Sequence, residues 1–441
     1  MPEPHSLPRG LIIAAPRSGA GKTTVTLGLL RAFSRNGIAV QPFKCGPDYI
    51  DPAFHAAAAG RPSFNLDSWV MQQSTVVELL ERATAGAEIV VVEALMGLFD
   101  GVATQGAWGT GASADLAALT GWPVILVLDV SGQSQTAAAV ARGFRGFREG
   151  VNIAGVLLNR VGSDRHIRLA TMAIEQQGLP VLGAIPRRAD LTMPERHLGL
   201  VQAGETTDLD QRLNTFADLV EGHVDLFRVM GSAAPGRHPA IARARRRPPG
   251  QRIALAKDAA FSFVYPHIAE QWRSAGAEIV PFSPLNDEAP DPGCDVAWLP
   301  GGYPELHLER LAGNAQFLTG TRDFAATKVV HGECGGYMVL GDSIDDANGK
   351  CFPMLGLLEL STSFAKRRMQ LGYRRATLLT DCPIGAKGSV VAGHEFHYAT
   401  IVKAPPRKLA NVTDADGNGV LEGGGVNGRV SGSFFHFVDA T

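Results

Sequence analysis

Residues 15–24 read APRSGAGKTT, and this short stretch decides the fold of the N-terminal half of the chain. It follows the apolar run 11–15 and opens the amphipathic segment 22–33, which predicts a strand, a glycine-rich turn and a helix. Gly19 and Gly21 let backbone N–H groups turn toward phosphate oxygens at the positive N-terminus of that helix. We therefore interpret the stretch as a phosphate-binding loop.

The loop departs from the usual pattern at its first position, where Pro16 stands in place of glycine. Lys22 is expected to reach the terminal phosphates of a nucleoside triphosphate, and the Thr23 hydroxyl to bind Mg²⁺. Thr24 follows in the same turn and is counted with the nucleotide-binding residues. Asn159 ends the later apolar run AGVLLN and could read an adenine edge with its amide, with a plain turn residue as the alternative.

Two further acidic residues are candidates for the magnesium site, because Mg²⁺ prefers hard oxygen ligands. Glu93 closes the apolar run IVVVE, at the carboxyl edge of a parallel sheet, where such folds bind ligands. Asp48 lies in a loop rich in glycine and proline. Asp51 and Asp100 lie close by in the sequence and are candidates for substrate contacts. A turn-forming or helix-capping role is the alternative for each of the four.

The pattern of apolar runs divides the chain into three parts. Over residues 1–228, continuous Val/Ile/Leu runs alternate with amphipathic stretches, as is typical of an α/β domain with a parallel sheet. Residues 229–250 combine Gly and Pro with a cluster of arginines, which predicts a linker rather than a nucleic-acid-binding patch. The alternation restarts over residues 251–441 and predicts a second α/β domain.

The composition limits the class of partner. With 45% hydrophobic residues, 19% charged residues and a net charge of −2, the 441-residue chain has no overall attraction to nucleic acid or to an anionic membrane. Its five cysteines form no CxxC pair, which argues against a zinc site and favours a reducing cytosol. The N-terminal residues do not resemble a signal peptide, and no apolar run reaches the roughly 18 residues that span a bilayer. We therefore expect a cytoplasmic protein.

A second motif, HGECGGYMVLG, occupies residues 331–341. Cys334 follows an apolar run and precedes two glycines, so its thiol is expected on a sharp strand-to-helix turn beside a helix dipole that favours the thiolate. Gly301 and Gly302 of LPGGYPE would supply backbone N–H groups for an oxyanion hole.

The thiol also needs a base, and the sequence offers three main candidates. His436 follows a short strand-like segment near the C-terminus, whereas His394 and His397 belong to the motif GHEFHY. Spacing alone does not choose between them.

Taken together, the motifs resemble those of the cobyrinic and hydrogenobyrinic acid a,c-diamide synthases of the cobalamin pathway. The resemblance runs in order from about residue 11 to the end of the chain, through PRSGAGKTT, FKCGPDYIDP, FNLDSW, EALMGLFDG, LPGGYPE, GECGGYMVLG, LGYR and GHEFHY. It implies an N-terminal P-loop domain with the fold of dethiobiotin synthetases, followed by a C-terminal domain like the class I glutamine amidotransferases.

The resemblance also implies an activity. Such an enzyme amidates the a and c carboxylates of a corrin acid, hydrogenobyrinic acid before cobyrinic acid, through an acyl phosphate made with ATP and Mg²⁺. The ammonia comes from L-glutamine at a Cys-His glutaminase. We consider a homodimer as its assembly. The alternatives are a ligase for another tetrapyrrole acid, of the siroheme or nickel type, and a nucleotide-switch protein whose amidase domain only binds.

Carried over to this chain, the resemblance makes Cys334 the nucleophile and His436 its base. Many class I glutaminases have a glutamate two residues after the histidine, but here Val438 occupies that position, which predicts a weakly activated glutaminase. Arg17 falls where related ATPases place a signature lysine. The residues carried over to the ATP and Mg²⁺ site are Lys22, Thr23, Asp48 and Glu93.

A basic stretch, FAKRRMQLGYRR, is expected to meet the acidic corrin, because forked guanidinium groups suit carboxylates. Its basic residues are Lys366, Arg367, Arg368, Arg374 and Arg375. Arg368 and Arg374 are the main candidates for substrate contacts, and an exposed charge cluster without a ligand is the alternative.

Overall fold

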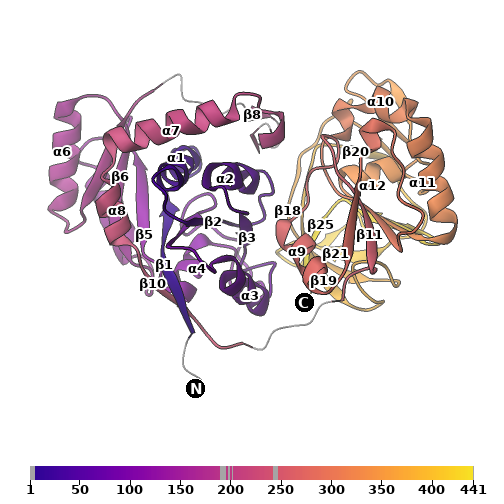
Figure 1. The fold of residues 1–441 in the computed structure, drawn as a ribbon, viewed down its shortest axis with the longest axis horizontal. Coiled ribbons are helices and arrows are strands. Elements are labelled where there is room, and N and C mark those ends of the chain that lie inside the picture. The colour runs from indigo at the N-terminus through magenta and orange to yellow at the C-terminus, as the bar shows by residue number, and fades with distance from the viewer. Residues whose placement is uncertain (1–4, 189–194, 197–198, 201, 242–246, 441) are drawn as a thin grey trace. The chain divides into compact units, whose positions relative to one another are not determined.

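The computed structural model confirms an α/β fold with two compact units (Figure 1). It describes residues 5–188, 195–196, 199–200, 202–241 and 247–440. The first unit comprises Met1–Trp69 and Gln73–Arg243, and the second comprises Val70–Gln72 and Ala244–Thr441. The chain therefore leaves the first unit briefly after Trp69 and returns to it at Gln73.

The first unit is built on a sheet with the strand order β3-β2-β4-β1-β5-β6-β7, and these strands run parallel. The strands are β1 (His5–Ala14), β2 (Val40–Cys45), β3 (Phe64–Leu66), β4 (Ile89–Glu93), β5 (Val124–Asp129), β6 (Ile153–Val161) and β7 (Val181–Pro186). The apolar runs of β1, β4 and β5 are almost completely buried, as expected of central strands covered on both faces.

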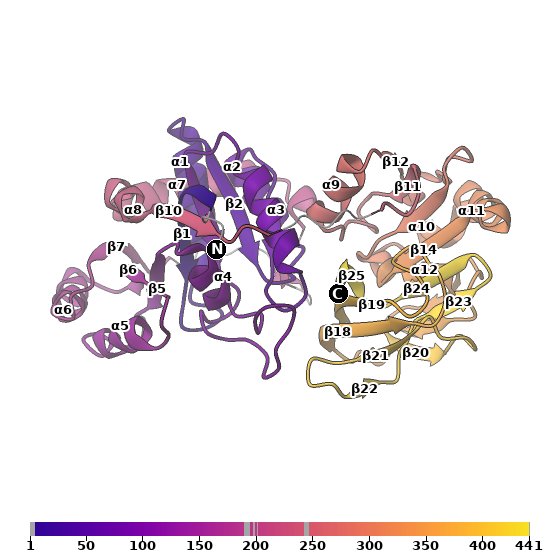
Figure 2. The same ribbon diagram turned by 90° about the horizontal axis from the view of Figure 1, so that it is seen from below.

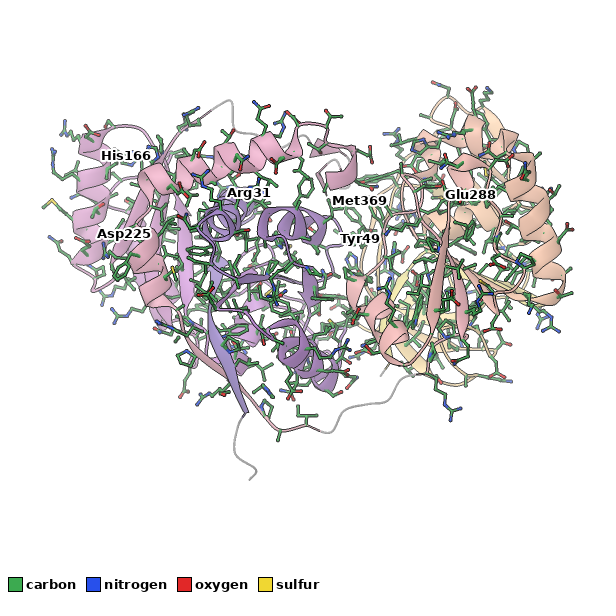
Figure 3. The ribbon with its side chains drawn as sticks, viewed as in Figure 1. Arg31, Tyr49, His166, Asp225, Glu288 and Met369 are labelled. Atoms are coloured by element: carbon green, nitrogen blue, oxygen red, sulfur yellow. The ribbon has the colours of Figure 1, made fainter. Side chains whose placement is uncertain are left out.

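Helices cover both faces of this sheet, with α1 and α7 on one side and α4 and α5 on the other (Figure 2). The helices are α1 (Lys22–Arg35), α2 (Asp51–Ala59), α3 (Gln73–Ala83), α4 (Ser113–Thr120), α5 (Ala137–Gly146), α6 (Asp164–Glu175), α7 (Leu209–His223) and α8 (Leu226–Ser232). A 3₁₀ turn, η1 (Ala203–Glu205), and the strand pair β8 (Glu195–Arg196) and β9 (Gly199–Leu200) precede α7. Arg31 of α1, labelled in Figure 3, donates to Asn214 and Asp210 of α7.

The segment 229–250, expected to be a linker, contains the end of α8 and the strand β10 (Ala234–His238). β10 pairs antiparallel with the N-terminal part of β1. Gly236 of β10 lies against the buried Trp122 ring, where a Cβ atom would come 2.4 Å from the indole nitrogen.

The second unit contains a sheet with the order β12-β11-β13-β14-β24-β23, parallel except for the last pair. Its strands are β11 (Arg252–Ala256), β12 (Glu278–Phe282), β13 (Val296–Leu299), β14 (Val329–Glu333), β23 (Gly425–Asn427) and β24 (Val430–Ser433). Its helices are α9 (Pro266–Ser274), α10 (Leu308–Gly313), α11 (Ala315–Thr327) and α12 (Gly335–Leu340), with the 3₁₀ turns η2 (Pro284–Asn286) and η3 (Pro304–Leu306).

Two smaller sheets complete the second unit. One has the order β22-β21-β18-β19-β25 and is antiparallel, and the other has the order β16-β15-β17-β20. The strands are β15 (Ser343–Asp345), β16 (Cys351–Pro353), β17 (Ser361–Ser363), β18 (Gln370–Leu378), β19 (Val390–His397), β20 (Thr400–Lys403), β21 (Ala410–Thr413), β22 (Gly419–Val420) and β25 (His436–Ala440). Tyr337 and Phe434 meet edge to face, with ring centroids 5.3 Å apart, in the apolar core between these elements.

None of the helices in the described part of the chain has the length and apolar character needed to cross a lipid bilayer.

Candidate functional site

The phosphate-loop sequence lies between β1 and α1, as predicted, and its backbone needs glycine at two positions. Gly19 and Gly21 have φ angles of 72° and 95°, in the left-handed region that glycine adopts without strain. A Cβ atom at Gly21 would come 2.2 Å from the amide nitrogen of Asn159. That nitrogen donates to the Ala20 carbonyl oxygen over 2.8 Å, so the Asn159 amide holds the loop in the described structure.

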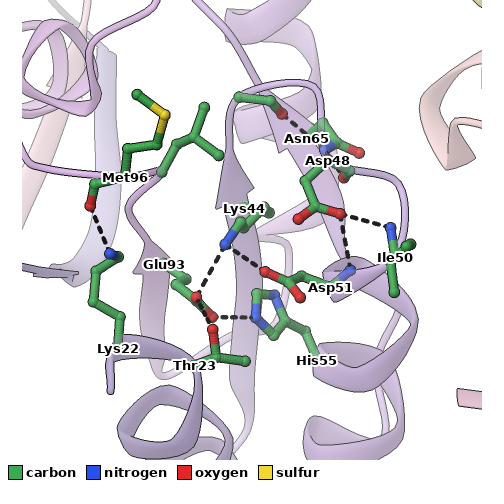
Figure 4. Close-up of polar contacts among 12 residues, drawn as sticks. Lys22, Thr23, Lys44, Asp48, Ile50, Asp51, His55, Asn65, Glu93 and Met96 are labelled. Atoms are coloured by element: carbon green, nitrogen blue, oxygen red, sulfur yellow. Dashed lines mark hydrogen bonds and ion pairs between the residues drawn. The ribbon is translucent and has the colours of Figure 1, made fainter. Parts of the chain in front are cut away.

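Lys22 at the start of α1 points its ammonium at backbone oxygen (Figure 4). Its Nζ donates to the carbonyl oxygens of Met96 at 2.5 Å and Arg17 at 3.3 Å. Burial and then the neighbouring Lys44 lower the pKa of Lys22 to about 8. A phosphate anion near this ammonium would favour its charged form.

Glu93 is fully buried and is the centre of a polar cluster at the carboxyl end of β4 (Figure 4). Thr23 donates its hydroxyl to Oε1 over 2.7 Å, and the His55 Nε2 atom lies 2.7 Å from Oε2. The Lys44 ammonium lies 3.0 Å from Oε1. Burial alone would raise the pKa of Glu93, but Lys44, His55 and Thr23 outweigh it and hold the pKa below its usual range. Glu93 is therefore an ionised carboxylate inside the fold.

Lys44 joins a second carboxylate to this cluster. Its Nζ lies 2.5 Å from Asp51 Oδ2, and Asp51 begins helix α2. Burial would lower the pKa of Lys44, yet Asp51, Glu93 and Asp48 together raise it above its ordinary value. The pKa of Asp51 is itself raised to about 6, first by burial and then by the charge of Asp48.

The side chains of Asp48 and Asp100 accept hydrogen bonds from backbone N–H groups, as a turn-forming or helix-capping role predicts. The Asp48 Oδ1 atom accepts from the N–H groups of Ile50 at 2.8 Å and Asp51 at 3.2 Å, at the start of α2. Asp100 is exposed, and its Oδ2 accepts from the Gly97 N–H over 2.9 Å. Asp48 still contributes charge to the Lys44 cluster, whereas the contact of Asp100 belongs to its own turn.

Sequence reasoning missed Lys44 and His55. Lys44 and Glu93 are register partners on the adjacent parallel strands β2 and β4. The available signal was a lysine at the end of a buried strand, since such a charge needs a partner inside the fold. His55 is fully buried on α2, where the sequence offers only a histidine in an alanine-rich helix.

Arg17 lies beside the loop and is paired with Asp129 at the end of β5, over 2.9 Å. Arg160 reaches the same carboxylate at 2.7 Å and also donates to the Gly19 carbonyl oxygen at 2.9 Å. Two guanidinium groups are therefore held next to the phosphate loop, and the Arg17 side chain is 64% exposed.

A pocket adjoins the loop on the side of β6, β7 and α7. Its polar lining includes Thr24 and Asn159, and its apolar lining includes Ile185, Pro186 and Leu219. A flat base could lie between these surfaces, since ligand pockets are mostly apolar with a few placed polar groups.

The donor set next to the loop fits Mg²⁺ in part. The Thr23 hydroxyl and the Glu93 carboxylate are hard oxygen donors, and they already lie within hydrogen-bonding distance of each other. Among the residues that the structure describes, no group of three or more His, Cys, Asp or Glu side chains is arranged to hold a metal ion by itself. A magnesium ion here would therefore need oxygen ligands from a bound nucleotide as well.

Cys334 occupies the turn between β14 and α12, as the sequence predicts. Its φ of 46° and ψ of −104° are unusual for a residue with a side chain, and such strain gathers at active sites. Its N–H donates to the Ser433 carbonyl oxygen over 2.8 Å. Gly336 follows in α12, where a Cβ atom would come 1.9 Å from the Leu299 carbonyl oxygen, so the turn requires glycine there.

The thiol is buried and protonated. Cys334 is 2% exposed, and burial, followed by the charge of Glu305, raises its pKa well above the ordinary value. A hydrogen bond from the Gly335 N–H at the start of α12 opposes this shift. A base is therefore required to form the thiolate.

His436 and Cys334 share Gly301 as a neighbour, whereas the thiol itself lies 3.9 Å from the Phe396 carbonyl oxygen. A Cβ atom on Gly301 would lie 2.2 Å from His436 Cε1 and 3.3 Å from Cys334 Cβ, so both residues pack against the same glycine. Burial, and then His394 and His397, lower the pKa of His436 to about 3, which keeps the imidazole neutral and able to accept a proton. Gly302 lies close by, since its nitrogen would be 3.1 Å from a Cβ atom on Gly335.

The two rival histidines have other surroundings. His394 is the register partner of His436 across the antiparallel strands β19 and β25. The Nε2 atom of His397 lies 2.8 Å from Glu395 Oε1, and the imidazole stacks on Phe434 with ring centroids 3.8 Å apart. The shared contact with Gly301 favours His436 over both.

The basic stretch separates into exposed and buried residues. Arg368 is exposed, and its N–H donates to the Tyr398 carbonyl oxygen over 3.1 Å. Arg374, in contrast, is 6% exposed and pairs with Glu395 over 2.5 Å. The alternative of an exposed charge cluster does not hold for Arg374, because its guanidinium faces a buried carboxylate, and its contact with the substrate stays a prediction.

Comparisons with known proteins agree with the two units. Residues 11–201 match the CobQ/CobB/MinD/ParA nucleotide binding domain, and residues 252–440 match the CobB/CobQ-like glutamine amidotransferase domain.

Full-length relatives are also found. The chain is 57% identical over 431 residues to the hydrogenobyrinate a,c-diamide synthase of Rhodobacter capsulatus, covering 98% of this chain and 99% of that protein. The proteins of the same name from Mesorhizobium japonicum and Agrobacterium fabrum are 56% and 54% identical, each covering 98% of both chains.

Proposed function

The chain belongs to the hydrogenobyrinate a,c-diamide synthase family, and on that premise we propose that it amidates the a and c carboxylates of hydrogenobyrinate with ATP and glutamine. The names of the relatives support the cobalt-free acid over cobyrinic acid and over a siroheme-type or nickel-type tetrapyrrole acid. The partners are then a corrinoid acid and L-glutamine. A cytoplasmic location and a homodimer remain predictions.

The observation that carries this proposal is the packing of Cys334 and His436 against one glycine, Gly301, on a strained turn. A degenerate amidase that only binds would not require a strained cysteine beside a neutral imidazole. The intact phosphate loop supports the other half of the reaction.

In the glutaminase, His436 takes the thiol proton of Cys334 while the sulfur attacks the carboxamide carbon of glutamine. The N–H groups of Gly301 and Gly302 would stabilise the oxyanion that forms. The imidazolium then returns the proton to the leaving ammonia, and a thioester remains. Water hydrolyses the thioester to glutamate and restores the thiol.

In the ligase, ATP with Mg²⁺ supplies the phosphoryl group that turns a substrate carboxylate oxygen into a leaving group. Lys22 and the loop N–H groups would bind the phosphates, and Thr23 and Glu93 would hold the metal, with Asp48 as a further candidate. Lys44 is placed between the carboxylates of Asp51 and Glu93, where its charge can offset charge on a transferred phosphoryl group. Ammonia replaces the phosphate and gives the amide.

The experiment that tests the proposal uses Cys334→Ser, with Cys294→Ser as a matched control for another buried thiol of the same unit. C334S should lose amidation driven by glutamine but keep amidation driven by ammonium chloride with ATP and Mg²⁺, while C294S keeps both. The product is measured by mass spectrometry on hydrogenobyrinate and cobyrinate in parallel. Glutamine-driven product from C334S, or a gain of amides on neither acid, would contradict the proposal.

A further inference from the structure

The position two residues after the proposed base holds no acid. Val438 is 1% exposed, and its carbonyl oxygen accepts from His267 of α9 over 3.0 Å. A valine side chain cannot hydrogen-bond an imidazole, although a catalytic base normally needs a third group to fix its orientation. The imidazole itself hydrogen-bonds the backbone of Phe263, and a further feature must fix the strand that carries His436.

We propose that Glu333 is the positioning residue of the glutaminase and that it acts on His436 through the backbone of β25. Glu333 is the last residue of β14 and immediately precedes Cys334. Its Oε1 atom accepts from the N–H of Phe437 over 2.8 Å, and Phe437 immediately follows His436. The inference rests on the proposed roles of Cys334 and His436.

The carboxyl group of Glu333 is buried and accepts two hydrogen bonds, one from Phe437 and one from Trp298. Glu333 is 5% exposed, and the Trp298 indole also donates to its carboxyl group. A hydrogen bond in such a dry site is stronger than one at the surface, and an unmade one is costly. The carboxyl oxygen is thus a fixed point for the backbone after His436.

A second contact fixes the backbone before His436. The Ser433 hydroxyl donates to the Phe435 carbonyl oxygen over 3.0 Å, while the Ser433 carbonyl oxygen accepts from the Cys334 N–H over 2.8 Å. Ser433 is also the register partner of Glu333 across β14 and β24. The backbone on both sides of His436 is therefore hydrogen-bonded to the paired residues Glu333 and Ser433, which adjoin the nucleophile.

The charge state of Glu333 suits this role. Burial raises its pKa to about 8, so the carboxyl group is mostly neutral at neutral pH. An ionised Glu333 would disfavour the Cys334 thiolate, since like charges oppose ionisation. A neutral amide oxygen can accept the same N–H, so glutamine should replace Glu333 without loss.

The test compares Glu333→Gln, Glu333→Leu and Glu333→Asp in the full-length enzyme. E333Q should hydrolyse glutamine like the wild type. E333L should lose kcat for glutamine by roughly tenfold to a hundredfold with little change in KM, since a small misplacement of a catalytic group has effects of that size. The side chain of E333D is shorter by one methylene, and this variant should show the same loss of kcat. It replaces E333L as the test variant if E333L does not fold. Amidation driven by ammonium chloride, measured on the same preparations, should be unchanged.

Glu288→Leu is the control, because Glu288 also accepts a backbone N–H, that of Ser283, over 2.7 Å, in the turn that follows β12. The proposal is overturned if E333L and E333D keep full glutaminase activity, if E333Q falls as far as E333L, or if E288L shows the same selective loss. The C334S variant shows which of the two proposals fails. Glutamine use by C334S contradicts the proposed glutaminase itself. An inactive C334S together with a fully active E333L contradicts only the role of Glu333.

Discussion

Lys44 and Glu93 are direct neighbours on the parallel strands β2 and β4, with the ammonium 3.0 Å from the carboxylate. Both side chains are buried, and Asp51 joins them from the start of α2. An ion pair of this kind inside a fold is expensive to break from one side, because the remaining charges are left without a partner. The cluster therefore serves the stability of the first unit as well as its proposed chemistry.

Lys44→Met should lower both the stability of the protein and its amidation activity. Removing the ammonium leaves Glu93 and Asp51 uncompensated, and the free energy of unfolding should fall by about 3–5 kcal/mol. Amidation from glutamine and from ammonium chloride should fall together, because both need the ligase site. Urea denaturation measures the first effect. Arg31→Met, which breaks a partly exposed pair with Asp210, is the control and should cost at most about 1 kcal/mol. Equal effects of the two substitutions would contradict the prediction.

Thr23→Val tests the proposed metal contact. Valine keeps the shape of threonine but removes the hydroxyl that lies 2.7 Å from Glu93 Oε1. The Mg²⁺ concentration for half-maximal amidation should rise by about tenfold or more, by analogy with the loss of groups that support a metal site. Thr23→Ser retains a hydroxyl and should behave like the wild type in the same titration. A T23V enzyme with unchanged Mg²⁺ dependence would remove Thr23 from the site.

Arg368→Gln and Arg374→Gln should separate a surface role from a structural one. R368Q removes an exposed charge, so we expect a higher KM for the corrin acid and little change in stability. R374Q leaves the buried Glu395 without its cation and should destabilise the protein by about 3–5 kcal/mol. Thermal unfolding and substrate titration of the two variants decide the matter. A stable R374Q with a selective rise in KM would restore Arg374 as a substrate residue.

The pKa of Glu333 predicts a pH dependence of stability. Its pKa is raised by burial from 4.5 to about 8, so the folded protein holds a proton that the unfolded chain has released. The stabilisation is complete below the unfolded value of 4.5 and is lost as the pH rises toward about 8. The free energy of unfolding of the wild type should therefore fall relative to that of E333Q between these two pH values. Parallel curves in urea denaturation across this range would disagree.

Cys334→Gly and Cys334→Ala provide a test of the strained turn. In ordinary positions glycine is less stable than alanine by about 0.5–1 kcal/mol. At φ 46° the order should reverse, because glycine has no Cβ atom to strain the backbone. The two variants lack the same thiol, so denaturation of this pair isolates the backbone effect. A less stable glycine variant would show that the turn is relaxed.

The sequence predicted those features that depend on local pattern. The phosphate loop and the cysteine turn were recognised because each combines a buried strand, glycines and a helix start within a few residues. The fold class followed from the long apolar runs. These signals survive in a single chain because the physics that produces them is short-range.

Contacts that depend on register could not be predicted. Lys44 meets Glu93 only because β2 and β4 are neighbours, although they are far apart in sequence. His394 and His436 are register partners across β19 and β25, so no spacing rule could choose between them. The buried partner of Arg374 is not visible in the sequence, because only the pairing of β18 with β19 brings Glu395 within reach of its guanidinium.

The pairing of β10 with β1 has a consequence for how the protein is made. Among the described strands of this sheet, β1 is synthesised before the others, but its antiparallel partner is completed only at His238, after the remaining strands. Closing so long a loop requires the rest of the unit to bring its ends together. A nascent chain arrested before residue 234 should therefore carry an unfinished first sheet, with Trp122 lacking the strand that covers it.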